Sequence, residues 1–170
     1  MELSATAVTG QAPLKLPIGL ISRVDIARLL RELNTLEDFF IAANNRIAGT
    51  SIEPPRVTRM LGALAEENRC NLLEANTRKT LTAKLNQVRE HAPQVHISFA
   101  SEPSPKALEH LTAWFRTSVH PQLLLQVGLQ PSIATGCMLR TPNKFFDMSL
   151  RAHLIKQEEY LVQLIKGAVG

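Results

Sequence analysis

The chain has 170 residues, of which 45% are hydrophobic and 20% charged, and its formal net charge is +4. This length allows one domain or two small ones, each with a buried core. Acidic residues accompany the basic ones throughout: 12 Lys and Arg against 10 Asp and Glu in residues 1–95, and 7 against 5 in residues 96–170. The charge pattern is that of a solvated surface, not of a basic stripe that binds nucleic acid.

The sequence fits neither a membrane-spanning protein nor a scaffold held by disulfides. No apolar run approaches the roughly 18 residues that a membrane-spanning helix needs. Cys70 and Cys137 are the only cysteines and lie far apart, which does not fit a disulfide scaffold. Residues 1–20 lack the basic and apolar regions of a secretory signal, so we expect the chain to act in the cytoplasm.

The first predicted helix follows a segment without periodicity. Residues 1–18 contain Ser, Thr, Gly and Pro and are expected to form a flexible N-terminal arm. From residue 21 onward, apolar residues at spacings of three to five predict a helix that ends near Asn44. Ser22 followed by Asp25 resembles a helix cap.

Two more helices complete the first half. Pro54-Pro55 predicts the start of the second helix, because proline suits the first turn. The third is predicted over residues 75–91, with Pro93 closing it. Short amphipathic helices persist only when packed together, so we expect a helical bundle domain over residues 19–93.

The second half alternates strands and helices. The predicted elements are strand 95–100, helix 105–119, strand 123–129, strands 136–141 and 144–147, and a terminal helix capped by Ser149. The predicted class is therefore α+β: an N-terminal all-helical bundle followed by a small C-terminal α/β domain, residues 94–170, with a short sheet and a terminal helix.

Motifs for enzymatic chemistry are absent from the sequence. There is no phosphate-binding G-x-x-x-x-G-K-[ST] run, no G-x-G-x-x-G, no C-x-x-C and no H-E-x-x-H. The five histidines are scattered, so we predict no metal site, no cofactor and no catalytic residue. Cys137 is interpreted as a small core residue, not a nucleophile.

Two polar or aromatic groupings leave alternatives open. His110 and Trp114, one helical turn apart, could stack on a ligand, but we interpret Trp114 as packed on the strands. Lys144, Asp147 and Ser149 could support acid–base chemistry in a small enzyme. The structural interpretation is favoured, in which Asp147 and Ser149 cap the terminal helix and Arg151 pairs with Asp147.

The same region resembles a known family. Residues 129–140, Leu-Gln-Pro-Ser-Ile-Ala-Thr-Gly-Cys-Met-Leu-Arg, and residues 143–151, Asn-Lys-Phe-Phe-Asp-Met-Ser-Leu-Arg, resemble the C-terminal motif of the delta subunit of F-type ATP synthase. The mitochondrial counterpart is the oligomycin sensitivity-conferring protein. The resemblance holds mainly over residues 95–166. Gln130 stands where the family usually has Asp, and the helical part is shorter than the family's six-helix bundle.

The resemblance implies a non-catalytic stalk subunit. Its helical part would bind the N-terminal helices of alpha subunits, and its C-terminal part would meet the membrane-anchored b subunit. The implied location is the cytoplasmic face of the cell membrane, peripheral, with the membrane reached only through the complex. No nucleic acid is implied.

Two sets of site residues follow from these expectations. Exposed members of one face of the first helix are expected to bind an alpha-subunit helix in a groove. That face consists of Val24, Leu29, Leu33, Leu36 and Phe40. The motif residues, expected to have a structural role, are Pro131, Gly136, Arg140, Lys144, Asp147, Ser149 and Arg151.

The main alternative is a basic helical nucleic-acid-binding protein. It is favoured by the sequence pI of about 9.4 and by several helical arginines. The even charge distribution and the single Trp and single Tyr argue against it.

Overall fold

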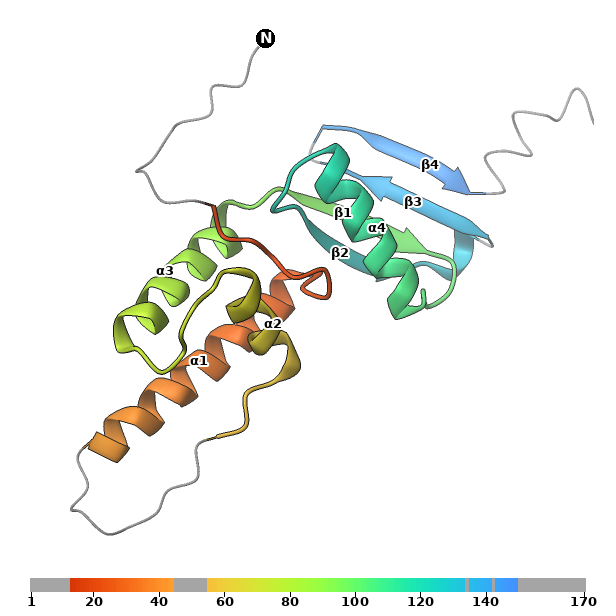
Figure 1. Ribbon diagram of the computed structural model, residues 1–170. Helices are drawn as coiled ribbons and strands as arrows, with labels where there is room; N and C mark the ends of the chain where they lie inside the picture. Colours follow the sequence, from red (N-terminus) through yellow and green to blue (C-terminus); the bar gives the residue numbers. More distant parts are fainter. Residues whose placement is uncertain (1–12, 45–54, 134, 142, 150–170) are drawn as a thin grey trace, which may run out of the picture.

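The computed structural model describes residues 13–44, 55–133, 135–141 and 143–149 (Figure 1). Three helices precede a four-stranded sheet that has one helix on its face, which confirms the α+β class. The predicted terminal helix lies outside the described residues. The elements are α1 Arg23–Asn44, α2 Arg59–Glu67, α3 Ala75–His91, β1 Gln94–Phe99, α4 Pro105–Ser118, β2 Leu124–Leu129, the 3-10 helix η1 Pro131–Ile133, β3 Gly136–Arg140 and β4 Phe145–Ser149.

The start of α1 is a capping arrangement, as the sequence predicts. The Asp25 carboxylate accepts hydrogen bonds from the backbone N–H of Ile21 (3.2 Å) and of Ser22 (2.9 Å). The Ser22 hydroxyl donates to the same carboxylate oxygen at 2.8 Å. These bonds satisfy backbone donors that would otherwise be unpaired at a helix start.

Helix α2 begins later than the sequence predicts. The expected start at Pro54-Pro55 is wrong, because the first helical residue is Arg59. The Thr58 hydroxyl accepts from the Leu61 N–H at 3.3 Å and donates to a Glu32 carboxylate oxygen at 2.7 Å. The cap is thereby tied to α1, a tertiary contact that no local pattern contains.

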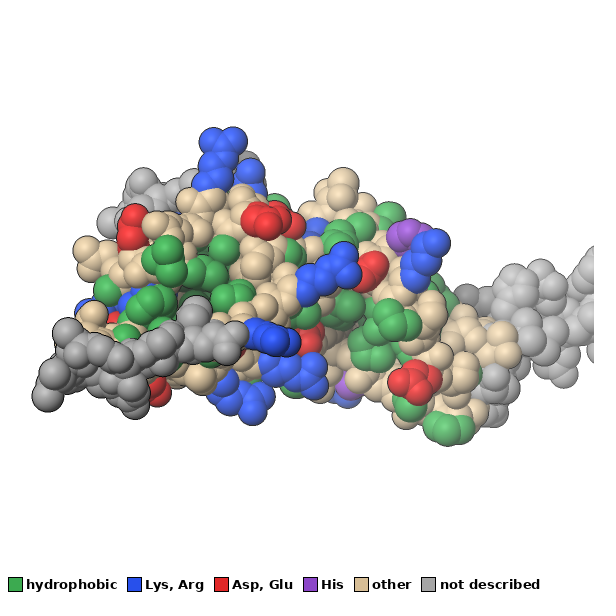
Figure 2. Space-filling model, turned by 60° about the horizontal axis from the view of Figure 1, so that its bottom comes forward, with side chains coloured by type: hydrophobic (Ala, Val, Ile, Leu, Met, Phe, Trp, Pro, Cys, Tyr) green, Lys and Arg blue, Asp and Glu red, His purple; other side chains and the backbone are tan. Residues whose placement is uncertain are grey.

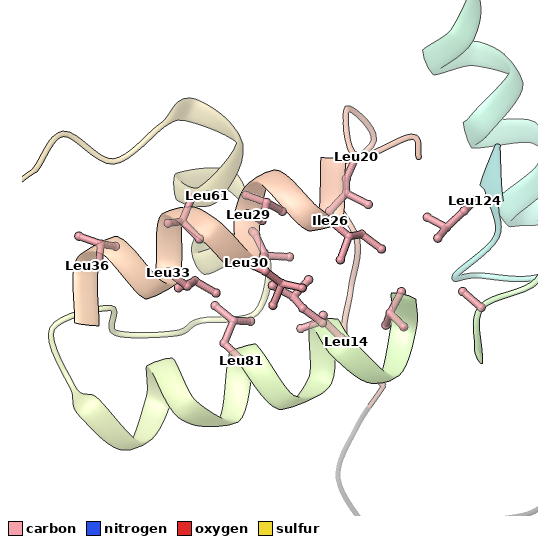
Figure 3. Packing of buried hydrophobic residues seen from close by; sticks show 14 residues of the cluster. Leu14, Leu20, Ile26, Leu29, Leu30, Leu33, Leu36, Leu61, Leu81 and Leu124 are labelled. Carbon is pink, nitrogen blue, oxygen red and sulfur yellow. The ribbon is translucent and has the colours of Figure 1, made fainter. Parts of the chain in front are cut away.

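The helical core lies between α1, α2 and α3. Figure 3 shows Leu30 and Leu33 of α1 directed toward Leu81 of α3, with Leu61 of α2 close by. Leu124 of β2 belongs to the same cluster and is fully buried. The hydrophobic effect holds these amphipathic helices together, because most of a helix's stability in a protein comes from the packing of its apolar face.

A buried arginine fixes the loop between α2 and α3. Arg78 is 3% exposed, and its Nε lies 2.5 Å from a Glu37 carboxylate oxygen. Its Nη1 donates to the carbonyls of Leu72 and Leu73 at 2.9 and 2.8 Å. The guanidinium lies 4.3 Å from the Phe40 ring centroid, a cation–π contact. One side chain thus joins α1, α3 and the connecting loop.

The sheet is mixed, with strand order β2-β1-β3-β4. Strands β1 and β2 are parallel, and α4 supplies the crossover that parallel neighbours require. Strands β3 and β4 pair antiparallel as a hairpin, in which Leu139 lies opposite Phe146 and Cys137 opposite Met148.

Helix α4 covers only part of the apolar sheet face. Phe115 is buried against Val95 and Ile97 of β1. Four strands span about 14 Å between their outer axes, whereas one helix is about 10 Å across. Trp114 is 59% exposed, so the interpretation that it packs on the strands is wrong. Its neighbour Phe115 fills that place.

Residues 13–18, expected to belong to a flexible arm, are packed. Leu14 is 5% exposed and lies in the helical core. Backbone atoms of Lys15 exchange two hydrogen bonds with the Asn68 side chain, at 2.9 and 2.8 Å. Residues 1–12 of the expected arm lie outside the described residues.

We expect Arg78→Met to lower the free energy of unfolding by about 2 to 4 kcal/mol, because it leaves Glu37 and two loop carbonyls without their donor. Urea denaturation of the full chain measures this. Lys79→Met, one position along α3 and exposed, is the matched control and should change stability by no more than about 0.5 kcal/mol. Equal losses in the two variants would contradict the structural role of Arg78.

Candidate functional site

The predicted docking face of α1 is mostly interior. Leu29, Leu33 and Leu36 are 1%, 1% and 4% exposed and pack in the helical core. Phe40 is half-buried beside Arg78. Of the five predicted residues, only Val24 presents a largely exposed side chain, at 58%. The three leucines therefore cannot act as surface anchors while the bundle is intact.

The exposed side of α1 is polar between two apolar ends. Val24 and Ile41 are both more than half exposed, near the first and last turns. Between them the solvent-facing residues include Arg28, Arg31 and Asp38. Helical periodicity marked the inward face correctly as apolar, but it could not distinguish the core from a docking surface.

Val24 borders a groove between α1 and the sheet. The groove has a volume of about 720 Å³ and includes Ile21, Leu108 and Val127 in its lining. Its lining also contains polar side chains such as Gln94 and Gln126. Because β2 is an edge strand, this groove lies where the sheet meets the start of α1. We call it the Val24 groove.

The motif residues lie along the β3–β4 hairpin and not in one cluster. Gly136 and Ser149 are paired at one end, and Arg140 lies opposite Phe145 toward the other. At the turn, the Lys144 N–H donates to the Thr141 hydroxyl at 3.0 Å. Pro131 starts the 3-10 helix η1 ahead of the hairpin, and Arg151 lies outside the described residues.

Asp147 and Ser149 are strand residues. β4 extends through Ser149, two residues beyond the predicted strand 144–147. The helix that they are predicted to cap lies outside the described residues, so the capping role stays a prediction. The Ser149 N–H donates to an Asp147 carboxylate oxygen at 2.9 Å, and Ser149 is 3% exposed. The sequence interpretation ended the strand at residue 147, because Pro142-Asn143 marked the turn but not the length of the strand after it.

Gly136 permits a close approach of the two hairpin strands. Its φ is +98°, in the region that favours glycine. A Cβ at this position would lie 2.5 Å from the Met148 carbonyl oxygen and 3.0 Å from the Ser149 Cα. No side chain fits there without moving β4.

The hairpin leaves an apolar surface beside α4. Phe146 and Met148 of β4 are 45% and 54% exposed on the sheet face that α4 partly covers. They adjoin Leu139 and Cys137 of β3, which are half-buried. We call these four residues the hairpin surface. Such exposed apolar neighbours are typical of a contact site.

Chemistry-bearing groups do not gather in the described residues. No group of three or more His, Cys, Asp or Glu side chains that could hold a metal ion occurs among them. Burial raises the pKa of the Cys137 thiol, which keeps it protonated and a poor nucleophile. Nor does any helix of the described chain have the length and apolar character to cross a membrane.

The visible surface mixes charges of both signs. Figure 2 shows Lys and Arg side chains interspersed with Asp, Glu and hydrophobic side chains on the face that it presents. This agrees with the balance of charges along the sequence and provides no continuous basic face in that view.

Two packed parts, a groove and an exposed apolar surface are typical of the class of proteins that dock with partners. Residues 22–161 match the model of the family described as ATP synthase delta (OSCP) subunit, and the chain belongs to this family. A search of curated proteins returned no match.

The family gives the chain a general role. It is a peripheral stalk subunit of ATP synthase, a structural component that associates with this membrane-associated complex. The resemblance seen in residues 129–151 is thereby confirmed, and the match extends back to the start of α1.

We expect Gly136→Ala to lower the free energy of unfolding by about 2 to 4 kcal/mol, because it combines a strained φ with a clash against β4. Denaturation followed by the fluorescence of Trp114, the chain's only tryptophan, reports on the α/β part. Gly62→Ala is the control, since a Cβ there meets nothing within 4 Å. As a helix-interior substitution it should stabilise by about 0.5 to 1 kcal/mol. Unchanged stability of Gly136→Ala would contradict the strand contact.

Proposed function

We propose that the chain links the catalytic head of an F-type ATP synthase to its membrane-anchored b subunits and so supports proton-driven ATP synthesis. The observation that carries this proposal is the presence of two separate apolar sites, the Val24 groove and the hairpin surface, at opposite edges of one sheet. A linker between two partners needs two such sites and no active site of its own.

The head side is assigned to the Val24 groove. A helix bound in a groove inserts apolar anchors at helical spacing. Val24 is the exposed member of the predicted docking face, and Val127 and Leu108 extend the apolar lining beside it. The proposed occupant is the N-terminal helix of an alpha subunit.

The stalk side is assigned to the hairpin surface. Phe146 and Met148 offer neighbouring apolar side chains on one face of β4. A second helix lying beside α4 would cover the uncovered half of the sheet face, given the widths of sheet and helix. The proposed occupant is the b subunit, together with the terminal segment of this chain.

The proposed role also implies a location. The chain would lie at the cytoplasmic face of the cell membrane and reach the membrane only through the complex. The proposal involves no nucleic acid and no cofactor.

Capture of a tagged full chain from gently solubilised source membranes tests the function directly. We expect alpha, beta and b subunits of ATP synthase to remain bound, identified by mass spectrometry. Recovery of nucleic acid or of unrelated proteins without synthase subunits would contradict the proposal. DNA affinity that falls steeply with salt would instead favour the nucleic-acid-binding alternative.

The two docking assignments predict separable effects. Val24→Asp should weaken binding of an alpha-subunit N-terminal peptide by about tenfold or more and leave binding of the b subunit unchanged. Met148→Asp should weaken binding of the b subunit by about tenfold or more and leave binding of the alpha-subunit peptide unchanged. Isothermal titration with each partner measures both affinities, with circular dichroism to check the fold. Val119→Asp, at a 61% exposed position outside both surfaces, is the control. An equal loss for both partners in either variant would contradict the assignment.

A further inference from the structure

Residues 13–21, which we call the strap, are bonded to both parts of the molecule. On the helical side, Leu14 and Leu20 are buried in the core. Lys15 exchanges two backbone hydrogen bonds with the side chain of Asn68, at the end of α2. The strap is therefore anchored to the helical bundle by packing and by directional bonds.

The α/β part holds the same strap through three further residues. The Gln122 side chain donates to the Leu14 carbonyl at 3.0 Å. The Leu125 N–H of β2 donates to the Ile21 carbonyl at 2.8 Å, and Ile21 packs against the α4–sheet core. Arg116 of α4 makes the remaining bonds.

Arg116 binds strap carbonyls 96 to 100 residues away in the chain. Its Nη1 donates to the carbonyls of Leu16 (3.0 Å) and Pro17 (2.8 Å), and its Nη2 donates to that of Leu20. Its Nε donates to the Leu123 carbonyl just before β2, at 3.3 Å. A guanidinium has five donors in a fixed plane, so it can hold several carbonyls in set directions, whereas an ammonium has three rotatable donors.

The strap adds a second connection between the two parts. The chain itself passes from α3 to β1 through Ala92 and Pro93, and a single short linker of this kind leaves rotation between domains as the default. Leu124 of β2 donates its N–H to the Pro93 carbonyl at 3.0 Å and inserts its side chain into the helical core. With the strap bonded on both sides, rotation about the linker would break contacts at two separate places.

We propose that the strap, oriented by Arg116, fixes the helical bundle and the α/β part as one rigid body with no hinge between them. This inference concerns the chain alone and does not rest on the proposed function. In a stalk subunit it would have the consequence that force applied at the hairpin surface reaches α1 without loss to bending.

Double electron–electron resonance on the full chain tests the inference. Spin labels are placed at Lys79→Cys on α3 and Lys106→Cys on α4, both exposed, with Cys70→Ser and Cys137→Ala as background. The doubly labelled chain with an unaltered strap should give a single, narrow distribution of distances between the two spin labels. A broad or multiple distribution would overturn the inference before any strap variant is made.

Arg116→Met removes the four donated bonds with little change in length. We expect the distance distribution to broaden while circular dichroism keeps its helical signal. Amide exchange at Lys15 and Leu125 should accelerate by about tenfold or more, and exchange inside α1 and α3 should stay unchanged. Arg59→Met, the same substitution at an exposed position of α2, should change neither measurement.

The test of the strap depends on whether Arg116→Met folds. A folded Arg116→Met chain with an unchanged distance distribution would overturn the role of Arg116. If Arg116→Met fails to fold, Gln122→Ala, which removes one strap bond, replaces it, with faster exchange at Lys15 as the expected result. Unchanged exchange in Gln122→Ala would then count against the strap.

Discussion

Three consecutive leucines, one just before β2 and two at its start, join the two halves of the molecule. Leu123, Leu124 and Leu125 are all fully buried. Successive side chains on a strand point to opposite faces, so they cannot share one core. Leu123 and Leu125 pack with α4, whereas Leu124 enters the helical core. Burying both faces at this point requires that the bundle lie against the sheet, and the arrangement of the strap and of α1 depends on that requirement.

Two arginines stabilise this arrangement from the inside. A charged side chain is costly to bury unless it is paired and hydrogen-bonded. Arg78 meets the requirement with Glu37 and two carbonyls, and Arg116 with four carbonyls. Burial lowers the pKa of Arg116 from its usual value, and the charge of Glu67 acts in the opposite direction. Both positions therefore tolerate neither lysine nor an apolar residue without leaving carbonyls unpaired.

The elements with local signals were predictable from the sequence. Helix 75–91 and the strand pair around α4 follow from periodicity and from the Ser104 cap, whose hydroxyl accepts from the Ala107 N–H. The start of α2 was not predictable, because Thr58 is tied to Glu32, 26 residues earlier. The packing of residues 13–18 also escaped prediction. Its hydrogen bonds join backbone carbonyls to Arg116. Every residue has a backbone carbonyl, so no sequence pattern marks the ones that are bonded.

The docking residues show the same limit of local patterns. An apolar face at helical spacing is equally typical of a core and of a binding groove, and on α1 it is the core. What distinguishes a docking residue is that the rest of the fold leaves it uncovered. Val24 remains exposed because it lies on the side of α1 turned away from the helical core, which Ile26 enters. Met148 remains exposed because α4, the one helix that the described residues place on that sheet face, cannot cover four strands. The Val24 groove and the hairpin surface thus both lie where neighbouring elements leave apolar side chains uncovered. In the part of the chain that the structure describes, three helices precede the sheet, and the two proposed docking sites lie where these elements leave the surface uncovered.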